Sequence, residues 1–178
     1  MIYVFLAEGF EEIEALATVD VLRRAKIEVK TIGVDSEIIE SAHNLTVVAD
    51  VRDIKSDFSY LSGIVLPGGM PGVINLQTSA FVKHAIDFCV SENLLIAAIC
   101  AAPSILGHMG VLNNKKVTCY PGFEQELKGA TVIDQDVCRD GNILTARGPG
   151  SAIDFALEII EYLKDEKTAQ KIADDIVY

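Results

Sequence analysis

A single cysteine, Cys100, stands between an apolar stretch at residues 94–99 and a segment that opens Ala101-Ala102-Pro103. A sharp strand-to-helix turn lifts one side chain above the end of a sheet, as it does for the serine of a nucleophile elbow. We expect a lowered thiol pKa there, because the positive end of a helix dipole favours the thiolate. The junction therefore predicts a reactive sulfur. A buried structural thiol is the alternative interpretation.

Two further loops contain groups that could assist this sulfur. Glu11, Glu12 and Glu14 follow an apolar stretch at residues 2–6, and a Gly-Gly pair at 68–69 follows another at 63–66. In an open parallel sheet, loops at the carboxyl ends of the strands share one edge, and ligands bind there. Composition alone does not say which glutamate transfers protons. The backbone N–H groups of Gly69 and Ala101 are candidate donors to an oxyanion formed at the cysteine.

The histidines give little support to a cysteine–histidine hydrolase, which needs an imidazole near the sulfur. The chain has three histidines, His43, His84 and His108, and none has an obvious place beside Cys100. A carboxylic acid is therefore the expected proton carrier. Cys119 ends a predicted strand near the site, where it is either a wall residue or a resolving thiol.

The elements that position these residues alternate between strands and helices, which is typical of an α/β domain with a mostly parallel sheet. We expect one domain over residues 1–178, with a small hairpin between 35 and 51. Strands are predicted at 2–6, 28–33, 63–66, 94–99, 117–119, 131–133 and 143–145. Helices are predicted at 11–25, 79–92, 101–110 and 166–176. Another is predicted from Ser151, with Asp154 completing a capping box.

Composition restricts the partners. With 15 basic and 26 acidic residues the formal charge is −11, which argues against nucleic acid or an anionic membrane as a partner. No stretch approaches the ~20 apolar residues that span a bilayer, and the amino-terminal residues do not resemble a signal peptide. We therefore expect a cytoplasmic protein. The four cysteines form no C-x-x-C pair, so neither a metal site nor a cofactor is expected.

Four motifs together resemble the ThiJ/PfpI superfamily, and most of all its branch that contains the parkinsonism-associated protein deglycase. They are Glu11-Glu12-Ile13-Glu14, Leu66-Pro67-Gly68-Gly69, Ala98-Ile99-Cys100-Ala101-Ala102-Pro103 and Arg147-Gly148-Pro149-Gly150. The resemblance implies a flavodoxin-like three-layer sandwich with a cysteine nucleophile elbow. It also implies a homodimer with the first helix at the interface.

The resemblance also implies roles for individual residues. Cys100 matches the reactive cysteine, and Glu14 matches a glutamate that hydrogen-bonds to its sulfur. Gly69 and Ala101 match residues whose amides face the site. Arg147 falls on a segment of the family that is structural and lies near the pocket. Gly68 and Tyr120 are further candidate residues of that pocket.

Two positions depart from the family pattern. The peptidase branch typically has histidine directly after the cysteine, whereas this chain has Ala101, which counts against intracellular cysteine peptidase activity. Many deglycase-branch members have histidine before the proline that matches Pro121, whereas this chain has Tyr120. A tyrosine hydroxyl donates a hydrogen bond but is a poor base at neutral pH.

The resulting hypothesis is a cysteine-dependent enzyme that protects against carbonyl and oxidative stress. Its substrate would be a small 2-oxoaldehyde, as for a glutathione-independent glyoxalase, or a glycated protein, as for a deglycase. The alternative is a redox sensor or chaperone without turnover, which acts through oxidation of Cys100.

Overall fold

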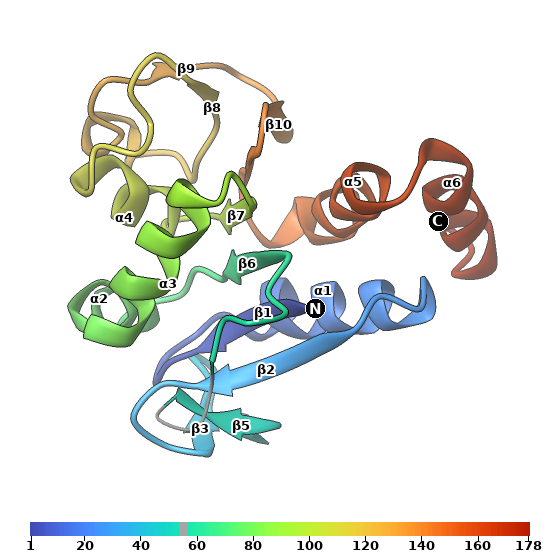
Figure 1. Cartoon of the computed structure of the whole chain (residues 1–178), viewed down its shortest axis with the longest axis horizontal. Helices are drawn as coiled ribbons and strands as arrows, with labels where there is room; N and C mark the ends of the chain where they lie inside the picture. The colour runs from blue at the N-terminus through green and yellow to red at the C-terminus, as the bar shows by residue number, and fades with distance from the viewer. Residues whose placement is uncertain (54–56) are drawn as a thin grey trace.

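A seven-stranded sheet forms the centre of the computed structural model, which describes residues 1–53 and 57–178 (Figure 1). The strand order is β10-β11-β7-β6-β1-β2-β5, and only β10 runs antiparallel to its neighbour. The strands are β1 (Ile2–Leu6), β2 (Val29–Gly33), β5 (Val51–Arg52), β6 (Gly63–Leu66), β7 (Leu95–Ile99), β10 (Val137–Asp140) and β11 (Ile143–Ala146). The predicted mostly parallel sheet is confirmed.

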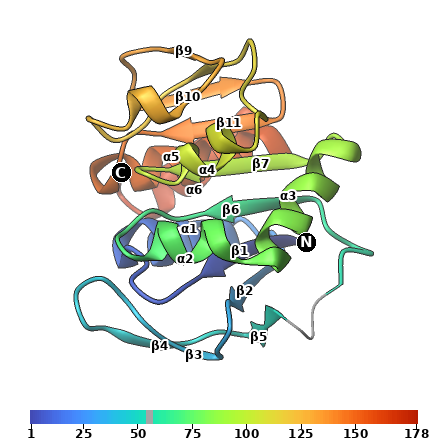
Figure 2. The same cartoon turned by 90° about the vertical axis from the view of Figure 1, so that its left-hand side faces the viewer.

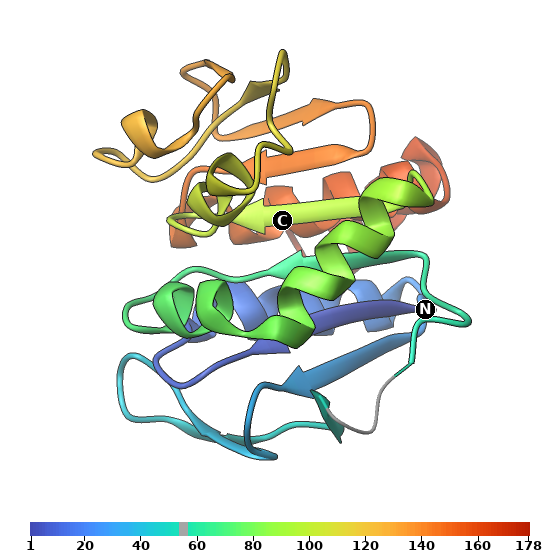
Figure 3. The same cartoon turned by 60° about the vertical axis from the view of Figure 1, so that its left-hand side comes forward.

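Helices cover both faces of this sheet (Figures 2 and 3). One face carries α1 (Glu12–Arg24) and α5 (Ala152–Leu163), with α6 (Glu166–Asp175) packed against α5. The other face carries α2 (Gly72–Thr78), α3 (Ala80–Ser91) and α4 (Pro103–His108). Because both faces are covered, central strands such as β1 and β7 are buried at every position, which explains their continuous apolar sequences. The three-layer flavodoxin-like sandwich predicted from the sequence is confirmed.

Two small sheets lie outside the main one. The predicted hairpin consists of β3 (Ile38–Glu40) and β4 (Thr46–Val48), which pair antiparallel. In the second, β8 (Lys116–Val117) pairs with β9 (Thr131–Val132). The predictions at 117–119 and 131–133 were therefore correct as strands but wrong about the sheet, because these strands pair with each other. Short 3₁₀ turns cover Glu124–Glu126 and Pro149–Ser151.

Helix ends account for the other departures from the sequence-based expectations. The Ser151 hydroxyl donates to the Gly148 carbonyl oxygen at 2.9 Å instead of capping α5, so the expected capping box with Asp154 was wrong. The elbow helix begins at Pro103, because residues 100–102 form the turn itself. No helix within residues 1–53 and 57–178 is long and apolar enough to cross a membrane.

Candidate active site

Three neighbouring strands bring the expected loops together at the carboxyl edge of the sheet. β6 lies between β1 and β7, so the loops that follow these three strands are adjacent. The loop at Tyr120 follows β8 and thus arrives from outside the main sheet. It is joined to the elbow by a hydrogen bond from the Tyr120 backbone N–H to the Cys100 carbonyl oxygen, at 2.8 Å.

Cys100 occupies a strained turn directly after β7. Its φ of +66° lies in the left-handed region, which non-glycine residues seldom adopt and which often marks a functional site. The surrounding chain holds this conformation from both sides: the Cys100 N–H donates to the Ala146 carbonyl oxygen at 2.9 Å, and its own carbonyl accepts from Tyr120. The residue is 9% exposed. The turn thus has the geometry of a nucleophile elbow with a nearly buried sulfur.

Glu14 lies on the first turn of α1, and its carboxyl group is fully buried against this sulfur. The Gly68 N–H donates to Glu14 Oε2 at 2.7 Å. The other oxygen, Oε1, is buried without a hydrogen-bonding nitrogen or oxygen among the described residues. A buried carboxylate oxygen without a donor is costly, whereas a protonated carboxyl group can itself donate to the sulfur. The surroundings of Glu14 therefore favour its protonated form.

The glycine pair after β6 permits this close contact between Glu14 and Cys100. A Cβ on Gly68 would lie 2.6 Å from Cys100 Cβ and 2.7 Å from Glu14 Oε2. Gly69 has a φ of +89°, and a Cβ there would collide with the Glu11 backbone nitrogen. The Gly-Gly sequence is therefore required by space at both positions, and by backbone conformation at the second.

The buried carboxyl and thiol groups share their protons. Burial raises the pKa of Glu14 to about 7. Burial and the nearby Glu14 charge raise the pKa of the Cys100 thiol to about 12, while the backbone N–H groups of Ala101 and Gly69 lower it. The lowered thiol pKa expected from the elbow position was therefore wrong for a thiol beside an ionised Glu14. Between these two values the pair holds one proton, and the thiolate forms when that proton is on Glu14.

The two predicted amide donors both face the sulfur. The N–H groups of Gly69 and Ala101 act on Cys100 as hydrogen-bond donors, and so favour negative charge at this position. Such a pair of amides has the character of an oxyanion hole. Their role toward a bound substrate stays a prediction.

Tyr120 and Arg147 line one pocket of about 400 Å³ together with Pro121 and Gly148. The Tyr120 ring lies against Gly148, where an added Cβ would be 3.2 Å from the ring. Arg147 forms an exposed ion pair with Asp134 at 2.7 Å. Cys119 is a buried free thiol whose pKa is raised to about 11 by burial. A wall residue therefore describes Cys119 better than a resolving thiol.

The three histidines have partners elsewhere. His108 Nε2 lies 2.6 Å from Glu126 Oε2, and the His84 ring packs edge-on against Phe58. His43, at the tip of the β3–β4 hairpin, lies 2.9 Å from Glu12 Oε1 at the start of α1. No pattern in the sequence signals this contact, because only the fold brings residue 43 beside residue 12.

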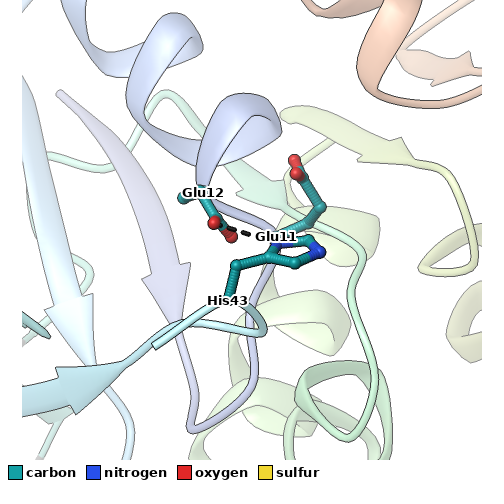
Figure 4. A group of neighbouring side chains, drawn as sticks. All are labelled: Glu11, Glu12 and His43. Carbon is teal, nitrogen blue, oxygen red and sulfur yellow. Dashed lines mark hydrogen bonds and ion pairs between the residues drawn. The ribbon is translucent and has the colours of Figure 1, made fainter. Parts of the chain in front are cut away.

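Glu11, Glu12 and His43 form the one group of potential metal ligands among the described residues, with donor atoms within 4.8 Å of one another. Figure 4 shows the Glu12 carboxylate turned toward His43 and the Glu11 carboxylate pointing away from that pair. Glu11 Oε2 instead accepts the Glu14 N–H at 2.7 Å. Glu12 Oε1 and Glu11 Oε2 thus already have partners, whereas Glu12 Oε2 is buried without a hydrogen-bond partner among the described residues.

Comparisons with known proteins identify the family. The chain is 37% identical over 173 residues to "Protein dj-1beta" of Drosophila melanogaster, covering 96% of this chain and 92% of that protein. It is 34% identical over 166 residues to "Glutathione-independent glyoxalase DJR-1.2" of Caenorhabditis elegans, covering 90% and 87%. The solved structure "Toxoplasma gondii DJ-1, oxidized" matches with a TM-score of 0.96 and 36% identity, covering 99% and 97%. The family model described as "DJ-1/PfpI family" matches residues 1–162, and the chain therefore belongs to the DJ-1/PfpI family.

Proposed function

We propose that this protein converts small 2-oxoaldehydes such as methylglyoxal to 2-hydroxy acids, with Cys100 as the nucleophile and without glutathione. The observation that carries the proposal is the buried Glu14 carboxyl group beside the Cys100 sulfur, since it offers a proton carrier with a pKa of about 7. A general acid–base works best when its pKa lies near the operating pH. The relative named as a glutathione-independent glyoxalase supports this choice.

The chemistry requires only the groups of the site and one water molecule. The Cys100 thiolate adds to the aldehyde carbon, and Glu14 supplies the proton that completes a hemithioacetal. The resulting Glu14 carboxylate removes the proton from that carbon and returns it to the neighbouring carbonyl carbon. The hydroxyl proton of the hemithioacetal passes to the neighbouring oxygen, so the first carbon becomes a thioester carbonyl and the second carries the hydroxyl group. The N–H groups of Gly69 and Ala101 hold the oxygen that becomes negative. Water then hydrolyses the thioester to lactate and restores the thiol.

A peptidase function fits the site less well. Peptide hydrolysis must protonate a leaving amine, a task that falls to histidine in cysteine peptidases. Here Ala101 follows the cysteine, and His43, His84 and His108 have partners elsewhere. Glycated proteins are the wider candidate substrate class, because an early adduct of a 2-oxoaldehyde keeps a ketone carbonyl beside the carbon that is bound to the protein.

Lactate formation from methylglyoxal tests the proposal directly. The assay uses amine-free buffer and no added thiol, with Cys100→Ser and Glu14→Ala in parallel. We expect many turnovers by the wild-type protein and none above background by either variant. Lactate formed by Cys100→Ser at the wild-type rate would contradict the proposal.

A second candidate is a redox sensor that uses the same sulfur. Two amides facing Cys100 could stabilise a sulfinate, and one solved relative is described as oxidized. Peroxide treatment followed by mass spectrometry separates the two functions. A sensor without turnover would form Cys100 sulfinate readily, and Glu14→Ala would change the extent of oxidation. A sensor of this kind would also form no lactate from methylglyoxal.

Assembly and location stay predictions. A homodimer through α1 would have to cover Ile13, which is 54% exposed on the first turn of that helix. We expect light scattering to give twice the chain mass and Ile13→Glu to lower it. A cytoplasmic location agrees with the sequence and is tested by fractionation.

A further inference from the structure

Glu11 is a second buried acidic residue beside the proposed reactive pair. It precedes α1 as its N-cap and is 7% exposed. Its Oε2 accepts the Glu14 N–H at 2.7 Å, and its own N–H donates to the Gly68 carbonyl oxygen at 3.0 Å. The backbone groups of Glu14 and Gly68 are thus both attached to Glu11, while the Gly68 N–H holds the Glu14 carboxyl group.

The charge of Glu11 acts on the same carboxyl group. After burial, which is the main cause, the Glu11 carboxylate is a further cause of the raised Glu14 pKa. Two negative charges close together in a buried site repel strongly, so an ionised Glu11 disfavours an ionised Glu14. Burial raises the pKa of Glu11 as well, but Glu11 is less deeply buried than Glu14, and the N–H of Glu14 that it accepts lowers this pKa. Of the two glutamates, Glu11 is therefore the better placed to hold the negative charge.

We propose that Glu11 is a positioning residue for Glu14: its carboxylate fixes the first turn of α1 and biases the proton shared by Glu14 and Cys100 toward the Glu14 carboxyl group. It acts through Glu14 and does not touch the sulfur. The proposal rests on the reactive Cys100–Glu14 pair of the proposed function. It adds a reason why the shared proton spends part of its time on the carboxyl group, and Cys100 is then the thiolate.

The other charged groups near these two glutamates are few. Glu14 faces Glu11 and Cys100. Glu11 faces Glu14, Glu12 on α1, and His43 from the β3–β4 hairpin. The hydrogen bond and charge of Glu12 raise the pKa of His43. Glu12 is directed toward His43 (Figure 4) and is not among the groups that shift the pKa of Glu14, so it offers a matched control in the same helical turn.

Alkylation of Cys100 by iodoacetamide, followed by mass spectrometry across pH 5 to 10, tests the proposal without requiring aldehyde turnover. The variant Glu11→Gln keeps an acceptor for the Glu14 N–H and removes the charge. We expect the acidic limb of its alkylation pH–rate profile to move to lower pH by about half a unit to one unit. The alkylation rate near pH 7.5 should fall about three- to tenfold, because less of the shared proton is on Glu14. Carbon-13 NMR of the Glu14 carboxyl group should show the same downward shift in its midpoint.

The control variant shows whether the effect depends on the position of Glu11 or only on the loss of one negative charge. Glu12→Gln removes one charge from the same turn and should leave the alkylation profile within about twofold of wild type. A Glu11→Gln profile that superimposes on wild type, or an equal shift in both variants, would overturn the proposal. Failure of the lactate assay alone would not, because alkylation reports on the thiolate and not on turnover.

Discussion

Cys89 in α3 and Cys100 at the elbow differ less in burial than in what surrounds them. Cys89 is fully buried on the helix that packs against β6 and β7, and Cys100 is 9% exposed. Burial raises the pKa of both thiols to about 12. For Cys89, burial is the whole cause, whereas Glu14 and two backbone N–H groups also act on Cys100.

This difference shows that burial alone keeps a thiol protonated and unreactive. A buried thiol becomes reactive when a neighbouring group can accept its proton. Within residues 1–53 and 57–178 no group near Cys89 takes the proton, so a thiolate there would be an uncompensated buried charge. At Cys100 the proton can move to Glu14 without leaving the site, and the remaining charge meets two amide donors. The same degree of burial therefore produces a structural thiol in one place and a candidate nucleophile in the other.

Matched serine substitutions give the largest expected contrast. Cys100→Ser should abolish lactate formation and change stability little, because a hydroxyl fits the polar elbow but is a far weaker nucleophile. Cys89→Ser should keep activity and lower the free energy of unfolding by about 1–3 kcal/mol, because it buries a hydroxyl among apolar side chains. Turnover assays and urea denaturation of both variants measure this. Equal losses of activity in the two variants would contradict the assignment of Cys100 as the nucleophile and Cys89 as a structural thiol.

The next largest effect is expected from adding one methyl group between Glu14 and Cys100. In Gly68→Ala the new Cβ would lie 2.6 Å from Cys100 Cβ, so the two side chains must separate. We expect turnover and Cys100 alkylation to fall on the order of 10²-fold, since a displacement of about 1 Å can cost that much. Circular dichroism checks that the fold is retained. Wild-type alkylation in a folded variant would mean that this close contact is unnecessary.

The sequence predicted the fold better than the proton chemistry. Strands 2–6, 63–66 and 94–99, which carry the site, were found within one residue, because central parallel strands are long apolar runs. The short strand β10 was missed, since Val137–Asp140 is half polar at an edge of the sheet.

Within the site, the resemblance singled out Cys100 and Glu14, and the structure brings them together. Neither the hydrogen bond from Glu14 to Glu11 nor the approach of His43 could be predicted. The direction of the thiol pKa was missed for the same reason. It depends on burial and on a carboxylate 86 positions away in the chain, whereas the sequence argument considered only the local helix.

The free energy of unfolding should depend on pH because of Glu14. Its pKa is about 7 in the folded chain and 4.5 as the ordinary value. Between these values the folded chain keeps a proton that the unfolded chain has released, so the free energy of unfolding falls as the pH rises. Glu14→Gln removes this loss and should be more stable than wild type at pH 8, by up to about 3 kcal/mol, but not at pH 4.5. Urea denaturation at both pH values checks this, and a pH-independent difference would contradict it.

The smallest effect is expected at Tyr120, which contacts the elbow mainly through its backbone. Its N–H donates to the Cys100 carbonyl oxygen, while its side chain is 46% exposed beside the pocket that Arg147 also lines. Tyr120→Phe keeps the backbone contact and the ring packing on Gly148 and removes only the hydroxyl. We therefore expect KM for methylglyoxal to rise less than about fivefold, the worth of one exposed hydrogen bond, with kcat unchanged. A fall in kcat of a hundredfold or more, on the scale of a lost general acid or base, would instead make Tyr120 a proton carrier and take that role from Glu14.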